Sequence, residues 1–362
     1  MHLLAALAAT AAAWDERGPD AVPTGRTVDA AARFVPGDPG WDRPGLLPET
    51  ASTEIGAVAR ETARELREQR AAGTVLADAG LFAELGVSLD DVDLVDRTAR
   101  EDRGAVHKRL EDPAWLAAHF DAWLWRSDTE GAAARDIALE PEQIRLTSYL
   151  VYQVEGRTAR DADHDTPLYA LPDAELAGAP PDLRLKYDRP AVYAGVYLDG
   201  EAAGAARPLV WLTRADANQA QLQGSVEVRT EDGRTRMYNV HENNGIPYDP
   251  AIRDGDRQRR FWYFREVQGI LGIEQIPLRP RAAVAGDVYD LGLGKLVALR
   301  WDGERGPEVH LAVLADTGGA FQPNLFQLDW LAGAFPSAAA YQAWAATVPK
   351  RVEAAVLVRR AP

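Results

Sequence analysis

The stretch HLAVLADTGGAFQPNLFQLDWLAGAF, residues 310–335, is the most informative part of the chain. Its apolar run from Leu311 to Ala315 is typical of a buried strand. This run leads directly into Asp316, Thr317, Gly318 and Gly319. Two consecutive glycines after a strand indicate unusual backbone dihedrals or a close approach to a ligand. We therefore expect a strand that ends at a functional loop.

A second acidic residue, Asp329, follows thirteen positions after Asp316. It stands between Leu328 and Trp330, and an apolar environment raises the pKa of a carboxyl because burial penalises the charged form. A nearby Asp316 would raise that pKa further. Such a carboxyl suits general acid catalysis near neutral pH. On spacing alone, two aspartates that cap turns remain the alternative.

The patterning elsewhere predicts an α+β chain that is mainly β. Residues 14–50 are rich in Pro and Gly and predict an irregular segment. Residues 50–127 have helical periodicity, with a helix expected to begin after Ser88 and a Trp-rich helix expected to run from Asp112-Pro113 through Leu124.

A β-rich half is predicted over residues 145–315. Short β-branched and aromatic runs, including residues 191–200 and 221–230, predict strands. Hairpin signals stand at Asp199-Gly200, Asp232-Gly233 and Asp302-Gly303. A helix over 337–346 and a closing strand over 354–359 are expected after it.

Composition excludes several classes of protein. The 362 residues suggest two domains, or one domain with a large insertion. With no Cys, the chain has no disulfide, no thiolate zinc site and no lipid-modified cysteine anchor. A net charge of −15 argues against nucleic acid as a partner. No run of 18 apolar residues exists, so no transmembrane span is expected.

Metal and cofactor motifs are weak, and we expect neither a metal nor a cofactor. The six His residues form no HExxH pair. Residues 290–295 contain GxG without the third glycine of a dinucleotide site. The cluster Asp161, Asp163, His164 and Asp165 lacks EF-hand spacing, so a solvated acidic loop is favoured over a calcium site.

The amino-terminal run from Leu3 to Ala13 is apolar and ends in small residues. It has the size of the hydrophobic region of a signal peptide but lacks a basic segment before it, so a short helix is the alternative. We expect export to the periplasm or cell envelope, and the sequence leaves cleavage of this run open.

Six segments, in order, resemble those of the membrane-bound lytic murein transglycosylase A (MltA) family, with its C-terminal three-aspartate (3D) domain. The resemblance covers about residues 90–362. In chain order the six segments are LTSY (146–149), TPLYALP (166–172), LQGSV (222–226), NGIPY (244–248), FWYFRE (261–266) and DTGGAF (316–321) with the later Asp329.

The resemblance implies a double-psi β-barrel with a helical N-terminal region and an inserted smaller β-barrel domain. On this basis residues 1–50 form a signal-like segment and irregular tether. Residues 51–155 and 262–362 form the helical region and the main barrel, and residues 156–261 form the inserted domain.

The implied activity is non-hydrolytic cleavage of the β-1,4 bond between N-acetylmuramic acid and N-acetylglucosamine in peptidoglycan. Asp329 matches the family's catalytic acid, and Asp316 matches its preceding aspartate. The expected contacts to the glycan strand come from hydroxyl, aromatic and amide groups and from the glycine loop: Thr147, Tyr149, Gln223, Ser225, Thr317, Gly318 and Gly319.

The chain also departs from the family pattern. The family's first aspartate aligns with Ala285, and neither Asp287 nor Asp290 is in register with it. The family's GGAIKG loop reads GGAFQP, and the segment between Pro247 and Phe261 is short. Two alternatives follow: a catalytically weakened glycan-binding or cell-wall scaffold protein, and a hydrolase that uses Asp316 and Asp329 as a pair. Endo or exo action and oligomeric state stay open.

Overall fold

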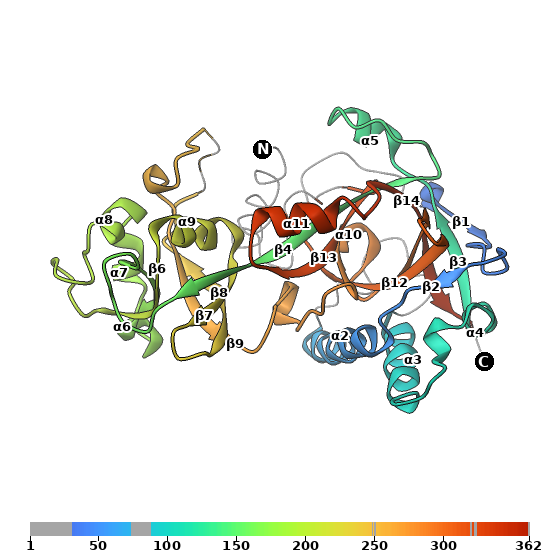
Figure 1. Cartoon of the computed structure of the whole chain (residues 1–362), viewed down its shortest axis with the longest axis horizontal. Helices are drawn as coiled ribbons and strands as arrows, with labels where there is room; N and C mark the ends of the chain where they lie inside the picture. Colours follow the sequence, from blue (N-terminus) through green and yellow to red (C-terminus); the bar gives the residue numbers. More distant parts are fainter. Residues whose placement is uncertain are drawn as a thin grey trace. The chain divides into compact units, whose positions relative to one another are not determined.

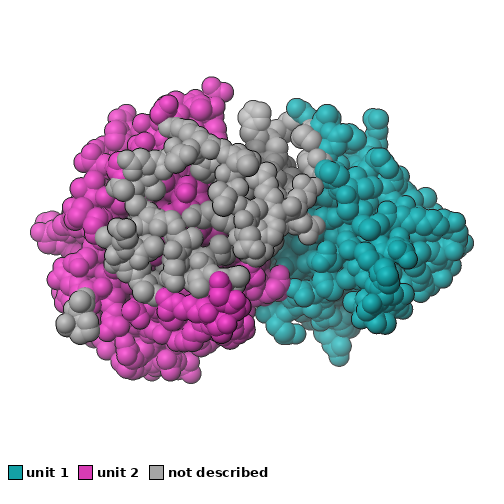
Figure 2. Space-filling model, turned by 180° about the vertical axis from the view of Figure 1, so that it is seen from behind, with its two compact units in different colours: residues 1–13, 150–270, 334–342 teal, residues 14–149, 271–333, 343–362 magenta. Residues whose placement is uncertain are grey.

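The computed structural model describes residues 31–73, 88–247, 249, 251–318, 321 and 324–360. The chain divides into two compact units, coloured separately in Figure 2. One unit consists mainly of residues 150–270, and the predicted insert over 156–261 falls within it. The other unit contains residues 14–149, 271–333 and 343–362, and is called the barrel unit below. The run from Leu3 to Ala13 lies outside the described residues.

The helices of the barrel unit precede most of its strands. The longest, α2 (Ser52–Ala72), buries Ile55, Val58 and Leu66 at helical spacing. It packs against α3 (Ser88–Glu101), which begins at the predicted residue. The short helices of this unit are η1 (Ala31–Arg33), η3 (Arg109–Glu111), α4 (Pro113–His119), α5 (Thr129–Ala133), η5 (Ile273–Gln275) and α10 (Val288–Leu291).

The predicted Trp-rich helix is wrong beyond His119. Asp112 caps α4 by accepting a hydrogen bond from the Ala114 N–H, as expected, but strand β3 (Phe120–Trp125) follows immediately. β3 pairs with β1 (Phe34–Gly37) on one side and with β14 (Arg351–Arg359) on the other. Pairing with distant strands outweighs the local helical pattern, because aromatic residues suit a half-buried sheet.

Six strands close into a mixed β-barrel, the central feature of this unit (Figure 1). Their order around the barrel is β14, β11 (Leu296–Gly303), β12 (Gly306–Asp316), β10 (Ala283–Ala285), β13 (Gln327–Phe335) and β4 (Ile144–Gly156). The ring closes where Arg351 and Val352 of β14 pair with Arg145 and Ile144 of β4. β10 runs parallel to β12, whereas β10 with β13, β12 with β11, β11 with β14 and β14 with β4 are antiparallel.

The predicted irregular segment over residues 14–50 is partly wrong. It supplies β1 to the barrel unit, and β2 (Leu47–Pro48) pairs in parallel with Glu308 and Val309 of β12. The predicted closing strand over 354–359 is confirmed as the larger part of β14, and the helix over 337–346 as α11 (Ala338–Ala345).

The other unit is built from the second half of β4 and five further strands. Tyr152–Gly156 of β4 pairs with β7 (Ser225–Thr230), which continues to β8 (Thr235–Asn243) and β9 (Trp262–Val267). A separate two-stranded sheet consists of β5 (Thr166–Pro172) and β6 (Ala206–Leu212). The helices are α6 (Asp173–Leu176), α7 (Asp182–Lys186), α8 (Arg189–Tyr193), α9 (Arg214–Gln223) and η4 (Gly255–Arg257).

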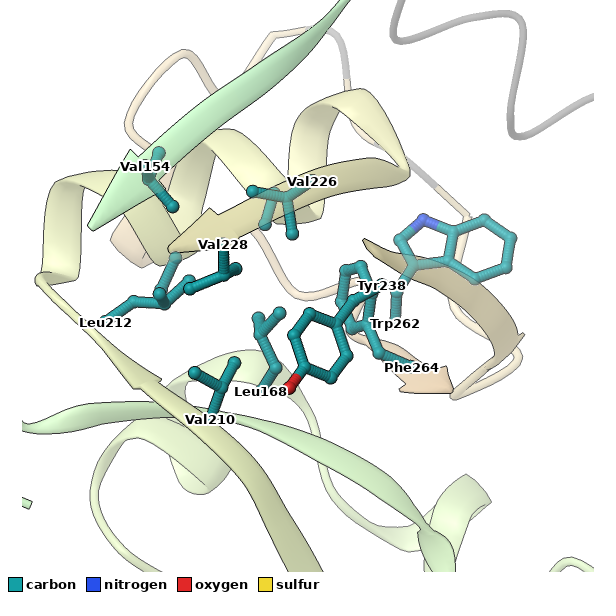
Figure 3. Close-up of a cluster of buried hydrophobic side chains, with 11 residues drawn as sticks. Val154, Leu168, Val210, Leu212, Val226, Val228, Tyr238, Trp262 and Phe264 are labelled. Carbon is teal, nitrogen blue, oxygen red and sulfur yellow. The ribbon is translucent and has the colours of Figure 1, made fainter. Parts of the chain in front are cut away.

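Figure 3 shows the apolar core that joins the two sheets of this unit. Leu168 and Val210 of the small sheet point toward Val226, Val228 and Tyr238 of the larger one. Each of these side chains is less than 2% exposed. Burial on this scale is the main source of stability for a small β-unit.

Two strand predictions in this unit are wrong. Residues 191–200 form the end of α8 and a series of turns, so Asp199-Gly200 is not a hairpin. Gln221 and Gln223 belong to α9, and the following strand begins only at Ser225. The left-handed Gly224, φ 78°, ends this helix, which is a role that glycine fills readily.

The other two hairpin predictions are confirmed. Asp232-Gly233 joins β7 to β8, and Asp302-Gly303 stands at the turn between β11 and β12. Among the described residues, no helix has the length and apolar character needed to cross a membrane.

Candidate active site

Asp316 and Asp329 lie on two barrel strands that flank a third. Ala285 of β10 pairs with Asp316 of β12 on one side and with Asp329 of β13 on the other. The register of β12 shifts here, because Val284 pairs with Leu314 and Ala285 with Asp316. Such an irregularity re-aims a side chain, and directly paired residues share one face of a sheet. The two carboxylates are therefore neighbours across Ala285.

The Asp316 carboxylate is held by three hydrogen-bond donors from three segments. The backbone N–H groups of Ile273 and Thr317 donate to Oδ1, at 3.1 and 2.9 Å. The Tyr149 hydroxyl donates to Oδ2 at 3.1 Å. Burial raises the pKa of Asp316 to about 6, against the lowering effect of these donors. Asp316 is thus a fixed group with little freedom to reorient.

Asp329 has a different environment. Burial, with a smaller contribution from the charge of Asp316, raises its pKa to about 7, against the lowering effects of Gln327 and Arg145. Its Oδ1 atom is buried and has no hydrogen-bond partner among the described residues. The Asp329 side chain is part-exposed as a whole. A carboxyl with this pKa carries a proton in a large fraction of molecules at neutral pH.

Alternate residues of β4 line the same region. Arg145, Thr147 and Tyr149 are part-exposed, whereas the residues between them are buried, as expected of a barrel strand with one face inward. The Arg145 guanidinium donates to Oε1 of Gln327, and the Gln327 amide donates to the Thr147 hydroxyl at 2.9 Å. Thr147 donates to the Leu328 carbonyl oxygen at 3.3 Å. These bonds tie β4 to β13 beside Asp329.

Tyr149 is a neutral donor in this site. Burial and the charges of Asp316 and Asp329 hold the pKa of its hydroxyl well above the ordinary value. A phenol in that state keeps its proton at all physiological pH values and donates it to Asp316. The tyrosine therefore orients the carboxylate without neutralising its charge.

The glycine loop is described in part. The Thr317 hydroxyl donates to the Gly286 carbonyl oxygen at 2.7 Å, which ties the start of the loop to β10. The Gly318 carbonyl accepts a hydrogen bond from Phe321. Gly319 lies outside the described residues.

Gln223 and Ser225 belong to the other compact unit, so the described structure does not place them beside the aspartates. Gln223 is the last residue of α9, and the Ser225 hydroxyl donates to Oδ1 of Asn239 at 2.6 Å. Their contacts to a glycan stay a prediction.

Asp287 and Asp290 have local structural contacts near β10. The buried Asp287 accepts hydrogen bonds from the backbone N–H groups of Asp290 and Asn324, at 3.0 and 2.8 Å. Asp287 thereby caps α10 and fixes the segment that leads into β13. The residue that pairs with both site aspartates is Ala285.

The acidic cluster after β4 is a turn in which Asp161 is the acceptor. Oδ1 of Asp161 receives the backbone N–H groups of Asp163 and His164, at 2.9 and 2.7 Å. Nδ1 of His164 lies 3.0 Å from the same oxygen. Across the described residues, no group of three or more His, Asp or Glu side chains is arranged to hold a metal ion.

Three groups that belong to the site were not predicted from the sequence. Arg145 and Gln327 each stand two positions before a predicted site residue, Thr147 and Asp329, so the period of two along a strand would have found them. The third is the backbone N–H of Ile273, and no sequence signal marks a backbone donor that comes from 43 residues away.

Comparison with known proteins gives a family match over part of the chain and a shared fold. A model of the MltA specific insert domain matches residues 145–253. The fold matches E. coli MltA with bound chitohexaose, with a TM-score of 0.60 at 16% identity, over 96% of this chain and 99% of that chain. The chain thus has the insert domain and the fold of the MltA family.

Two further MltA structures support this assignment. MltA from Neisseria gonorrhoeae matches with a TM-score of 0.59 at 15% identity, over 96% of this chain and 95% of that chain. A membrane-bound lytic murein transglycosylase from Agrobacterium tumefaciens matches with a TM-score of 0.58 at 16% identity, over 91% and 98%. No curated protein sequence matches the chain. At these identities the likeness to MltA is a likeness of fold.

Proposed function

We propose that this protein is a peptidoglycan lytic transglycosylase that cleaves the β-1,4 bond between N-acetylmuramic acid and N-acetylglucosamine. The observation that carries the proposal is the pair of carboxyls across Ala285. Asp329 has a pKa raised to about 7 and an oxygen with no hydrogen-bond partner in the described part of the chain, and Asp316 is fixed by three donors. The bound chitohexaose in the E. coli relative supports a glycan as the ligand.

In the first step, protonated Asp329 acts as the general acid. It gives its proton to the glycosidic oxygen while the bond from that oxygen to the anomeric carbon of the muramyl residue breaks. The anomeric carbon gains positive charge in the transition state. Asp316 stabilises that charge electrostatically, because its hydrogen bonds orient the carboxylate without supplying a counter-cation.

In the second step, the Asp329 carboxylate acts as the base. It takes the proton of the muramyl 6-hydroxyl, whose oxygen then bonds to the anomeric carbon and forms the 1,6-anhydro sugar. The proton lost by Asp329 in the first step is regained here, so the enzyme returns to its starting state. One acid/base carboxyl suffices, since the substrate supplies its own nucleophile at high effective concentration.

The remaining predicted residues complete the proposal. Thr147 and Tyr149 present hydroxyl and aromatic groups beside Asp329, and Thr317 and Gly318 begin the loop next to Asp316. Gln223, Ser225 and Gly319 are proposed as further glycan contacts. The barrel is proposed to have double-psi topology, the other unit to be a small inserted β-barrel, and the protein to act in the periplasm or cell envelope.

The decisive test is a digest of purified peptidoglycan sacculi with the wild type and with Asp329→Asn. Mass spectrometry of the released fragments should show anhydromuropeptides, lighter by one water than hydrolytic products, for the wild type alone. Hydrated reducing ends would identify the two-carboxylate hydrolase instead. Release that survives Asp329→Asn would exclude Asp329 as the acid.

A catalytically weakened glycan-binding protein is the second candidate, and Ala285 is the observation that favours it. An alanine occupies the position that pairs with both site aspartates and aligns with the family's first aspartate. This candidate predicts that the wild type and Asp329→Asn are retained equally on sacculi and that neither releases muropeptides.

A further inference from the structure

A tight turn in the barrel unit, residues 272–276, contains two consecutive residues in the left-handed conformation. Glu274 has φ 52° and ψ 27°, and Gln275 has φ 61°. This region is strained for residues other than glycine, and Gly or Asn usually occupies it. The turn is closed by a hydrogen bond from the Gly272 N–H to the Ile276 carbonyl at 2.9 Å and by the pairing of Leu271 with Pro277.

The turn is anchored on both sides. Ile273, Ile276 and Leu278 are at most 4% exposed, so their side chains fix the turn in the apolar core. Gly272 lies against the end of β12, where a Cβ atom would stand 2.7 Å from the Ala315 carbonyl oxygen. Gly272 has φ −96°, which any residue adopts, so lack of space is the reason for glycine at this position.

The result of this anchoring is one hydrogen bond. The Ile273 N–H, at the start of the turn, donates to Oδ1 of Asp316 at 3.1 Å. The other groups that face Asp316 are the Tyr149 hydroxyl from β4, the Thr317 N–H and the Asp329 carboxyl of β13. Glu274, within the turn, is half-buried and interacts with Glu65 of α2.

The chemistry of the donor matters for the pair of carboxyls. An arginine or lysine would hold Asp316 equally well, but its charge would cancel the repulsion that helps to keep Asp329 protonated. A backbone N–H holds the carboxylate and leaves its charge in place. Strain that is kept next to a functional group is typical of pre-organised sites.

We propose that the turn Gly272–Ile276 is a positioning element for Asp316, and that its two left-handed residues are retained because they aim the Ile273 N–H at this carboxylate. The catalytic meaning of this inference rests on the proposed function. The geometry itself is testable without activity.

The test compares two substitutions of one residue in the full chain. Ile273→Pro removes the N–H, and the extended conformation of Gly272 is the one that a following proline requires. Ile273→Ala is the matched control, because it removes the side chain and keeps the N–H. The pKa of Asp316 is read by carbon NMR of protein labelled at the aspartate carboxyl carbons, with the resonance assigned by Asp316→Asn.

We expect the pKa of Asp316 in Ile273→Ala to equal that of the wild type. In Ile273→Pro it should rise by about one unit, the usual effect of losing one hydrogen bond to a carboxylate. If the proline variant fails to fold, Gly272→Ala decides, since its Cβ pushes the turn away from β12 and should raise the same pKa. An unchanged pKa of Asp316 in Ile273→Pro would overturn the inference. If Ile273→Pro does not fold, an unchanged pKa of Asp316 in Gly272→Ala would overturn it.

Activity on sacculi is the second measurement. If the wild type releases anhydromuropeptides, Ile273→Pro should turn over roughly tenfold more slowly than Ile273→Ala with a similar KM, as the loss of one electrostatic contact predicts. If the NMR shift is seen but the wild type releases no muropeptides, the positioning role stands and the transglycosylase proposal fails.

Discussion

The surroundings of Asp316 and of Asp329 differ although both residues pair with the same alanine. Asp316 stands at the end of β12 and receives three donors, two of them backbone N–H groups. Asp329 stands inside β13 and has a buried oxygen that finds no hydrogen-bond partner among the described residues. Two chemically equal carboxyls thus have different surroundings, because the backbone around each supplies a different number of hydrogen-bond donors.

The substitution that separates the two roles most strongly is Asp329→Asn. It keeps the shape of the side chain and removes the proton that the mechanism transfers, so release of anhydromuropeptides should fall by about 10²–10⁴-fold. The measurement is the initial rate of muropeptide release from sacculi. Asp316→Asn is the variant for comparison. An equal loss of the release rate in both variants would contradict the division of roles between the two aspartates.

Asp316→Asn should have the smaller effect on rate, roughly 10–100-fold, because it removes electrostatic support and not the proton donor. It should also change the pH profile. Without the charge of Asp316 the pKa of Asp329 falls from about 7, so the pH at which activity is lost on the alkaline side moves downward. A pH–rate profile that keeps its alkaline limb in place would show that the two carboxyls do not interact.

Asp329→Asn should also stabilise the fold in a pH-dependent manner. The folded pKa of Asp329 lies above the unfolded value, so the folded state holds a proton that the unfolded chain releases, and stability falls as pH rises from about 4 to about 7. The variant lacks this loss of stability and should therefore be more stable than the wild type at pH 8 and differ little from it at pH 4. Urea unfolding at both pH values measures this, and an equal effect at the two would refute it.

Tyr149→Phe is expected to have the smallest effect of this series. It removes one of three donors to Asp316 and leaves both backbone donors, so the rate should fall only several-fold, in line with one neutral hydrogen bond of about 1 kcal/mol. Asp316 should titrate at a higher pH in the variant. A loss as large as that of Asp316→Asn would show that the phenol contacts the substrate as well.

Much of the site could be predicted from the sequence, because its central residues lie on strands with a readable period. The structure brings Asp316, Asp329, Thr147 and Tyr149 together in the barrel unit, with Ala285 between the two aspartates. The apolar run before Asp316 and the apolar neighbours of Asp329 marked the two aspartates in the sequence, whereas Thr147 and Tyr149 were predicted only through the resemblance to the MltA family.

The errors have a common physical cause. Phe120–Trp125 becomes a strand because β14, more than 200 residues later, offers it a pairing edge. Residues 191–200 have strand-like composition but form the end of α8 and turns. The Ile273 N–H carries no side-chain signal at all. Contacts made by distant backbone are the part of a fold that a single sequence reveals least.

The closure of the barrel also bears on when the protein becomes active. β4 carries Thr147 and Tyr149. β14 closes the ring by pairing with the first residues of β4. A ribosome-bound chain that has not yet reached Arg351 therefore cannot complete the scaffold around Asp329. The site can therefore form only after β14 has been made, although its two carboxyls and their three donors all precede Arg351 in the chain.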